Sequence, residues 1–396
     1  MKKLHIFLPV IAFFALVSCS EEAGQSFIDE NIEFARAQIG KEIEVIEADT
    51  QTILNPTHRK ADGSVNYCTV HDWRAGFFPG SIWLLYELTG DKEYIPLAEK
   101  YTEAIEEVKY ITDNHDVGFI CMCSFGNGLR LNNEKYEDII IQTADALATR
   151  FNPVVGLTQS WGTSESLDRK YPVIIDNMMN LELFFKASEL SGDKKYYDMA
   201  VSHADRTLKE HFRPDGSCYH VVDYDPVTGE VRKKVTAQGF SDESVWSRGH
   251  AWAVYGYTMA YRYTGDRRYI DQALKTFHVI WDNPEMPEDG VPYWDMCAPG
   301  FPDAFRDASS AAIMASALYE ICTMDVENPQ QYKDDADKIM ATLASPRYRA
   351  QLGDNGRFLL MHSVGSLPGN AEVDKPLNYA DYYFLEALVR KMKLER

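Results

Sequence analysis

The sequence predicts an all-α fold in which two concentric rings of helices form an (α/α)6 barrel, with one small β-hairpin on the rim. Helical spacing of apolar residues covers most of the 396-residue chain. A tight corner between helices occurs three times, and only one pair of segments alternates in polarity as strands do. No linker or low-complexity stretch divides residues 27–396, which are therefore predicted to form one domain.

The predicted helices follow from apolar residues spaced three and four apart between loops rich in Gly, Pro and Asn. They cover residues 27–45, 80–89, 92–111, 134–151, 177–190, 193–211, 246–264, 266–281, 308–325, 329–344 and 378–393. These are about eleven helices, one short of two complete rings of six, so one helix is expected to lack a clear periodic signal.

The recurring corner is a Gly-Asp pair followed closely by a tyrosine. Its copies lie at Glu87–Tyr94, Glu189–Tyr196 and Tyr263–Tyr269. Glycine ends a helix in the left-handed conformation, and aspartate accepts hydrogen bonds from the free N–H groups of the next helix. The tyrosine is expected to pack back on the preceding helix. Each copy therefore predicts two antiparallel helices joined by a tight turn.

The predicted hairpin joins residues 217–223 to residues 230–236. Both segments alternate in polarity, and Asp225–Gly229 between them has the composition of a turn.

One apolar stretch contains a charge. Tyr171–Phe185 is almost wholly apolar, but Asp176 lies in its first half. A buried carboxylate is costly unless it is paired, hydrogen-bonded or protonated. Asp176 is therefore either an N-cap of helix 177–190 or a functional acid.

Composition narrows the possible ligands. A net charge of −20 argues against nucleic-acid binding, and an anionic ligand would depend on a few local cations. Aromatic residues make up 12% of the chain, with 23 Tyr and 7 Trp. This content favours a ligand with flat faces, such as a sugar. Most individual aromatic side chains are nevertheless expected to pack in the core.

The N-terminus is predicted to be an export signal. Lys2 and Lys3 precede the apolar stretch 6–17, which is too short to span a membrane stably. Leu16–Cys19 resembles the lipobox of bacterial lipoproteins, which predicts cleavage before Cys19 and its lipidation; an ordinary secretory signal is the alternative. Residues 20–26 then form a tether. The mature protein is expected in the periplasm or at the outer membrane, held by the lipid alone.

The other six cysteines are predicted to be free and mostly buried thiols. Their spacing is irregular, and Cys121 and Cys123 lack the second pair that a zinc site requires. We expect no metal and no cofactor.

Unusual residues cluster in four places, at residues 71–80, 114–119, 161–176 and 238–252. Two carboxylates on neighbouring loops are the minimum equipment for cleaving a glycosidic bond, one protonated in an apolar setting and one ionised. Asp176 has the apolar setting, and Asp116 has a polar one. Taken alone, Asp116 is more readily explained as a turn residue, and Asp176 as a helix N-cap.

Longer motifs resemble those of glycoside hydrolase family 88, the unsaturated glucuronyl hydrolases. The motifs are HDVGF (115–119), VIIDNMMNL (173–181), QGFSDESVWSRGHAWAVYG (238–256) and YADYYFLEAL (379–388). The resemblance runs from about residue 70 to residue 390, and such long, ordered motifs make it specific. It implies an (α/α)6-barrel glycosidase that removes a Δ4,5-unsaturated uronic acid from the non-reducing end of oligosaccharides left by glycosaminoglycan lyases.

The resemblance also implies roles for individual residues. Asp176 matches the family's general acid/base, and Asp116 matches its second essential aspartate. The implied substrate-binding residues are Trp161, His220, Gln238, Trp246, Arg248 and Trp252, with Trp73 and Tyr379 as looser matches. Arg248, His220 and Gln238 are expected near the substrate carboxylate. His250 departs from the pattern, which has glutamine there, and is expected to alter how Arg248 is held.

Two alternative functions stay open at this point. Unsaturated rhamnogalacturonyl hydrolases share the barrel and the product chemistry, and a non-catalytic glycan-binding lipoprotein would need the aromatics but not Asp176. Residues 362–376 resemble the family's loop near the second sugar, where sulfate is accepted or refused. The sulfation pattern and the oligomeric state are left open.

Overall fold

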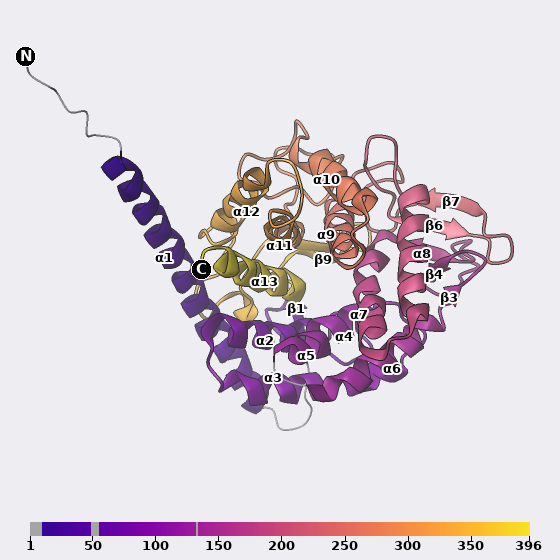
Figure 1. Cartoon of the computed structure of the whole chain (residues 1–396), viewed down its shortest axis with the longest axis horizontal. Helices are drawn as coiled ribbons and strands as arrows, with labels where there is room; N and C mark the ends of the chain where they lie inside the picture. The colour runs from indigo at the N-terminus through magenta and orange to yellow at the C-terminus, as the bar shows by residue number, and fades with distance from the viewer. Residues whose placement is uncertain (1–9, 49–54, 132–133) are drawn as a thin grey trace, which may run out of the picture.

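The computed structural model describes residues 10–48, 55–131 and 134–396, with side chains from residue 24 onward. Within these ranges the helices form an inner and an outer ring, and successive helices alternate between them (Figure 1). The (α/α)6 barrel predicted from the sequence is therefore confirmed.

The inner ring is the more deeply buried of the two, and almost every residue of α9 and α11 is buried. It consists of α2 (Phe77–Thr89), α4 (Val117–Cys121) with α5 (Asn127–Leu131), α7 (Leu181–Ser191), α9 (Ser247–Thr264), α11 (Ala308–Ile321) and α13 (Asn378–Leu394). The outer ring consists of α1 (Val10–Ala48), α3 (Tyr94–Glu103), α6 (Glu137–Ala148), α8 (Lys194–Glu210), α10 (Arg267–Trp281) and α12 (Pro329–Leu343).

Short helical segments complete the rings. The 3₁₀ helix η4 (Ile175–Asn180) leads into α7, and the π-helical turn η2 (Met122–Gly126) joins α4 to α5. Three further 3₁₀ segments are η1 (Glu106–Tyr110), η3 (Glu134–Tyr136) and η5 (Asn355–Arg357).

The three predicted corners are present. Gly90, Gly192 and Gly265 have φ values of 68°, 73° and 67°, in the left-handed region. The following aspartates accept from backbone N–H groups two residues on, at 2.9–3.0 Å. Tyr196 packs on the preceding α7, as predicted, and its hydroxyl also donates to Asp145 of α6 at 2.8 Å. The corner thus ties outer helix α8 both to its inner partner α7 and to the preceding outer helix α6.

The helix without a clear periodic signal is the inner segment that runs from α4 through η2 to α5. Gly118, Gly126 and Gly128 interrupt its apolar pattern, and glycine is a poor helix former. Packing requires two of these glycines to be small. A Cβ on Gly118 would lie 2.6 Å from the Cα of Asn180, and one on Gly128 would lie 2.5 Å from the ring of Tyr136. Packing against neighbouring elements therefore requires glycines that interrupt the apolar periodicity, so this helix could not be predicted from the sequence pattern.

The predicted hairpin is β6 (Val221–Tyr224) paired with β7 (Val231–Val235), and β5 (Pro172–Ile174) adds a third antiparallel strand. Three other hairpins were not predicted: β1 (Asn55–Arg59) with β2 (Val65–Cys68), β3 (Phe151–Asn152) with β4 (Leu157–Thr158), and β8 (Ser363–Ser366) with β9 (Ala371–Lys375). Strands of two to five residues are too short to show a reliable alternation.

The N-terminal predictions fall largely outside the described part. Lys2, Lys3 and the side chain of Cys19 are not described, so export and lipidation stay predictions. The backbone of α1 runs through residues 20–26, which were predicted to be a tether. In the described chain, no helix combines the length and the apolar character needed to cross a membrane.

The cysteines outside the N-terminal segment are free thiols. Cys68, Cys121, Cys123 and Cys218 are buried, and Cys297 is exposed. Among the described residues, no group of three His, Cys, Asp or Glu side chains lies together as a metal site would require.

Candidate active site

Asp176 is the second residue of η4, between strand β5 and helix α7. Its neighbours Ile175, Asn177 and Met178 are fully buried, and the side chain makes no capping hydrogen bond, so the N-cap interpretation is wrong. Burial is the main cause that raises the pKa of Asp176, to about 7; the charge of Asp116 adds to it and that of Arg248 opposes it. A carboxyl with this pKa is protonated in a large fraction of molecules near neutral pH.

His220, the residue before β6, faces Asp176. Its Nε2 lies 3.8 Å from Oδ2 of Asp176. Its Nδ1 accepts hydrogen bonds from the backbone N–H groups of Ala237 and Gln238, at 3.1 and 3.2 Å, so the proton of the neutral ring belongs on Nε2. Burial, aided by the charges of Arg248 and Arg169, lowers the pKa of His220 well below its usual value. The ring therefore presents a neutral N–H donor to the space beside the acid.

Asp116 precedes α4 and has a similar histidine neighbour. His115 Nε2 lies 3.4 Å from Oδ2 of Asp116, and Asn180 Nδ2 lies 3.3 Å from Oδ1. The polar setting expected for Asp116 is not what the structure shows, because burial raises its pKa to about 7 as well. The two aspartates therefore titrate in the same range, and both can change charge near neutral pH.

Asn180 joins the two segments that hold the aspartates. Its Oδ1 accepts from the N–H of Phe119 at 2.8 Å, which orients the amide so that Nδ2 points to Asp116. Gly118 allows this contact, since its Cα lies against Asn180. The glycine of the HDVGF motif thus brings α4 and η4 close together.

Arg248, expected at the substrate carboxylate, is 2% exposed. Its guanidinium donates to the carbonyls of Val364 and Gly365 in β8, and Nη1 lies 3.4 Å from Oδ2 of Asp307. Asp307 is fully buried and caps α11. Arg248 therefore holds the β8–β9 hairpin against α9 and α11, and its expected contact with substrate stays a prediction.

A second arginine, Arg74, also anchors this hairpin and was missed. Arg74 forms an ion pair with Glu372 of β9 at 3.0 Å and a two-pronged pair with Asp72. Glu372 also lies 3.6 Å from Nδ1 of His58 in β1. The unusual composition of residues 71–80 was the available signal, but only Trp73 was singled out there.

The aromatic candidates divide into two groups. Trp252 and Tyr379 are each 1% exposed and pack in the core with Phe119 and Trp73. Both are therefore core residues in this structure, and their expected contact with substrate stays a prediction.

Trp161 and Trp246 both contact His220. The ring centre of Trp161 lies 5.7 Å from that of His220 with the planes nearly perpendicular, and the ring centre of Trp246 lies 4.5 Å from it. Both tryptophans thus pack on the histidine that faces Asp176, and Trp161 is only partly buried.

His250 and Gln238 have defined structural partners. His250 Nε2 accepts from the N–H of Cys218 at 3.1 Å, and Nδ1 lies 2.8 Å from the carbonyl of Trp246. His250 thus ties the first turn of α9 to the segment before β6 and makes no described contact with Arg248. Gln238 Nε2 lies 3.4 Å from the carbonyl of Gly365, so Gln238 also reaches the β8–β9 hairpin.

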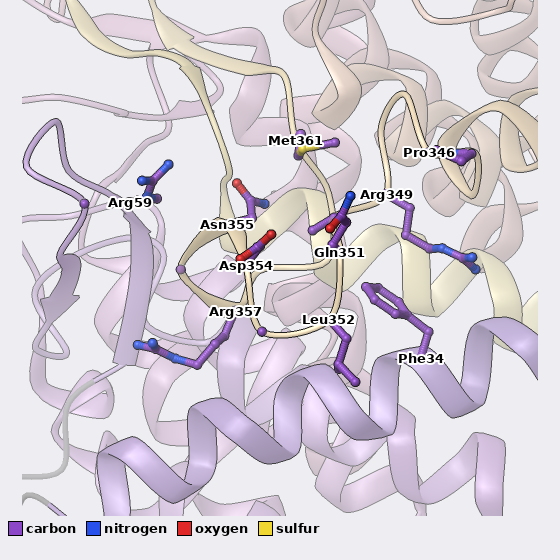
Figure 2. Close-up of a pocket in the computed structure, with 14 residues that line it drawn as sticks. Phe34, Arg59, Pro346, Arg349, Gln351, Leu352, Asp354, Asn355, Arg357 and Met361 are labelled. Carbon is purple, nitrogen blue, oxygen red and sulfur yellow. The ribbon is translucent and has the colours of Figure 1, made fainter.

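Two cavities lie away from these aspartates. One of about 1010 Å³ lies between α1, the β1–β2 turn and residues 346–361 (Figure 2). In Figure 2, Leu352 points toward α1, which carries Phe34. Another of about 600 Å³ is bordered by the partly exposed ion pairs of Arg262 with Glu182 and Glu320. Neither is lined by a predicted site residue.

Residues 45–384 match the model of the family described as Glycosyl Hydrolase Family 88. The chain is 43% identical to an "Unsaturated glucuronyl hydrolase" of Formosa agariphila, over 100% of this chain and 99% of the relative.

Two solved structures are also similar. An unsaturated glucuronyl hydrolase specific for heparin is 40% identical, with a TM-score of 0.89 over 93% of this chain and 98% of the other. An aspartate-to-asparagine variant of the Streptococcus agalactiae unsaturated glucuronyl hydrolase, complexed with dGlcA-GalNAc6S, is 30% identical, with a TM-score of 0.77 over 92% and 90%.

Proposed function

The chain belongs to glycoside hydrolase family 88, and we propose that it is an unsaturated glucuronyl hydrolase. It releases the Δ4,5-unsaturated uronic acid from the non-reducing end of oligosaccharides. Polysaccharide lyases produce these oligosaccharides when they cleave glycosaminoglycans. The observation that carries this proposal is a pair of largely buried aspartates on adjoining segments, with side chains 16% and 13% exposed, each beside a buried histidine and each with a pKa of about 7.

Asp176 acts first as an acid and then as a base. The substrate has an enol ether between C4 and C5, and the protonated carboxyl gives its proton to C4. Positive charge then develops at C5 and the ring oxygen. Water adds its oxygen to C5 and returns a proton to the Asp176 carboxylate. The resulting hemiketal opens, and the bond to the next sugar breaks.

Asp116 and the histidines assist without forming bonds. An ionised Asp116 stabilises the positive charge that develops in the ring, which is worth most in a buried site. Neutral His220 offers its Nε2–H to the water or to a ring substituent, because Nδ1 is already occupied by two backbone donors.

The experiment that tests the function is a panel of unsaturated disaccharides. We expect the purified protein to remove the double-bond absorbance of unsaturated chondroitin or heparin disaccharides and to release the second sugar in equal amount. Unsaturated rhamnogalacturonan disaccharide is the comparison substrate. Turnover of that substrate alone would overturn the proposal in favour of a rhamnogalacturonyl hydrolase, and tight binding without turnover would indicate a glycan-binding protein.

The pH dependence should follow the two aspartates. Activity requires Asp176 protonated and Asp116 ionised, so kcat/KM is expected to fall both above and below a maximum near pH 7. The two limbs belong to the coupled pair rather than to single residues. The measurement is kcat/KM between pH 4 and pH 9 on one disaccharide. A profile that stays flat to pH 9 would contradict the assignment of Asp176 as the acid.

Export and lipid anchoring form a second part of the proposal. The support is the Lys2–Lys3 start, the short apolar stretch and the lipobox-like Leu16–Cys19. The mature protein would then be held by Cys19 in the periplasm or at the outer membrane. Labelling of growing cells with palmitate should mark the wild-type protein and not Cys19→Ser; equal labelling of both would refute the anchor.

A further inference from the structure

Arg169 is an arginine at the edge of the site. It was not identified as a site residue from the sequence. It lies on the loop between Trp161 and β5, and its guanidinium carbon is 5.0 Å from the centre of the Trp161 ring. Trp161 in turn meets His220, which faces Asp176. Two ring contacts thus connect Arg169 to the proposed acid.

The loop that carries Arg169 is held rigidly. Ser164 and Arg169 exchange two backbone hydrogen bonds, at 2.8 and 2.9 Å, and so close the turn between them. Asp168 then pairs with Arg232 at 2.7 Å and with Lys233 at 3.2 Å, both on β7. The base of Arg169 is therefore fixed before any ligand arrives, which lowers the entropy lost on binding.

The charge of Arg169 is not neutralised within the described part of the chain. Its neighbour Asp168 is occupied by two cations, and no described carboxylate lies within ion-pair distance of Arg169. Arg248, by contrast, is buried and hydrogen-bonded to two carbonyls. In a chain with net charge −20, a half-buried, unpaired arginine beside the site is a local attraction for an anion.

The position of Arg169 distinguishes between the anionic groups of the substrate. The uronate carboxylate is attached to C5, the atom at which the proposed reaction occurs, and must lie close to Asp176. Arg169 contacts the Trp161 ring, which in turn contacts His220, and no hydrogen bond or ion pair joins Arg169 to Asp176 among the described residues. The charge of Arg169 contributes to the lowered pKa of His220 but not to the pKa of Asp176. An anion bound by Arg169 is therefore better explained by a group other than the carboxylate on C5.

We propose that Arg169, stacked on Trp161, binds a sulfate group of the unsaturated oligosaccharide. This inference rests on the proposed function. The planar fork of a guanidinium donates two parallel hydrogen bonds to a sulfate, and stacking on an indole keeps that fork oriented. The sulfate belongs either to the uronate ring or to the neighbouring hexosamine, and separate substrates distinguish the two.

The test compares Arg169→Ala, Arg169→Lys and Lys170→Ala on three unsaturated disaccharides: unsulfated, sulfated on the uronate and sulfated on the hexosamine. For Arg169→Ala, we expect kcat/KM to fall about tenfold more on one of the sulfated substrates than on the unsulfated one. Arg169→Lys should lose less, because it keeps the charge but not the fork. Lys170→Ala is the matched control: it removes an adjacent exposed cation, which pairs with Asp225.

Equal effects of Arg169→Ala on all three substrates, or a selective effect of Lys170→Ala as large as that of Arg169→Ala, would overturn the inference. A binding experiment tests the sulfate contact independently of the proposed function. It measures the affinity of the same disaccharides by calorimetry in the Asp176→Asn background. If the wild type cleaves none of them, the proposed function fails. A selective tenfold loss of sulfated-ligand affinity in Asp176→Asn/Arg169→Ala would still support the sulfate contact, and an unselective loss would refute it.

Discussion

Asp176→Asn is expected to lower kcat on an unsaturated disaccharide by about 10³-fold or more, since general acid and base assistance contributes about 10²- to 10⁴-fold. Asparagine occupies the same volume but neither gives a proton to C4 nor accepts one from water. The measurement is the loss of double-bond absorbance with time, together with release of the second sugar. The matched control is Asp198→Asn, an exposed surface carboxylate of α8 that pairs with Lys194.

The same variant has a stability signature that excludes misfolding. The folded-state pKa of Asp176 lies above its usual 3.8, so the ionised side chain destabilises the folded protein as the pH rises through about 7. Asparagine carries no charge, so the melting temperature of Asp176→Asn should exceed that of the wild type at pH 8, by on the order of a few degrees. At pH 4 this difference should vanish. Normal turnover by the variant would show that Asp176 is not the acid.

Asp116→Asn should lower kcat/KM by about 10²- to 10³-fold, the effect typical of removing one electrostatic contact to a transition state. The variant keeps an oxygen that accepts from Asn180, so the junction between α4 and η4 should survive. What it loses is the negative charge beside the developing positive charge of the ring. Steady-state kinetics at pH 7 on one disaccharide measure the loss, which should appear mainly in kcat.

Asp113→Asn is the control for that experiment, because Asp113 is an exposed aspartate three residues before Asp116. Its kcat/KM should remain within about twofold of the wild type, as is usual for an exposed side chain that makes no special contact. If Asp116→Asn and Asp113→Asn behaved alike, the role of Asp116 would be limited to structure.

A raised pKa alone does not identify a catalytic carboxylate in this protein. Burial raises the pKa of Asp381 to about 8, yet its two oxygens accept from the backbone N–H groups of Leu359 and Leu360. Asp381 is therefore occupied in joining α13 to the segment before β8. Asp176 differs because its Oδ2 is buried without a hydrogen-bond partner among the described residues and faces a histidine N–H.

Local chemistry explains which parts of the fold could be predicted. The corners at Gly90, Gly192 and Gly265 depend on the conformation of one glycine and on hydrogen bonds two residues away, so a few letters predict them. The helix from Val117 to Leu131 could not be predicted in this way. Its glycines are required by contacts with Asn180 and Tyr136, which lie on other elements.

The ring of helices, the hairpin near residue 225 and the candidate acids Asp176 and Asp116 could be predicted from the sequence. Each of these depends on periodicity, on turn residues or on an ordered motif within a short stretch. The folded structure was needed to find that Arg248 holds residues 364 and 365, that Asn180 links the two aspartate segments, and that Arg169 stacks on Trp161 without a described ion-pair partner. Burial and charge pairing depend on contacts between residues far apart in the chain, and no local pattern records them.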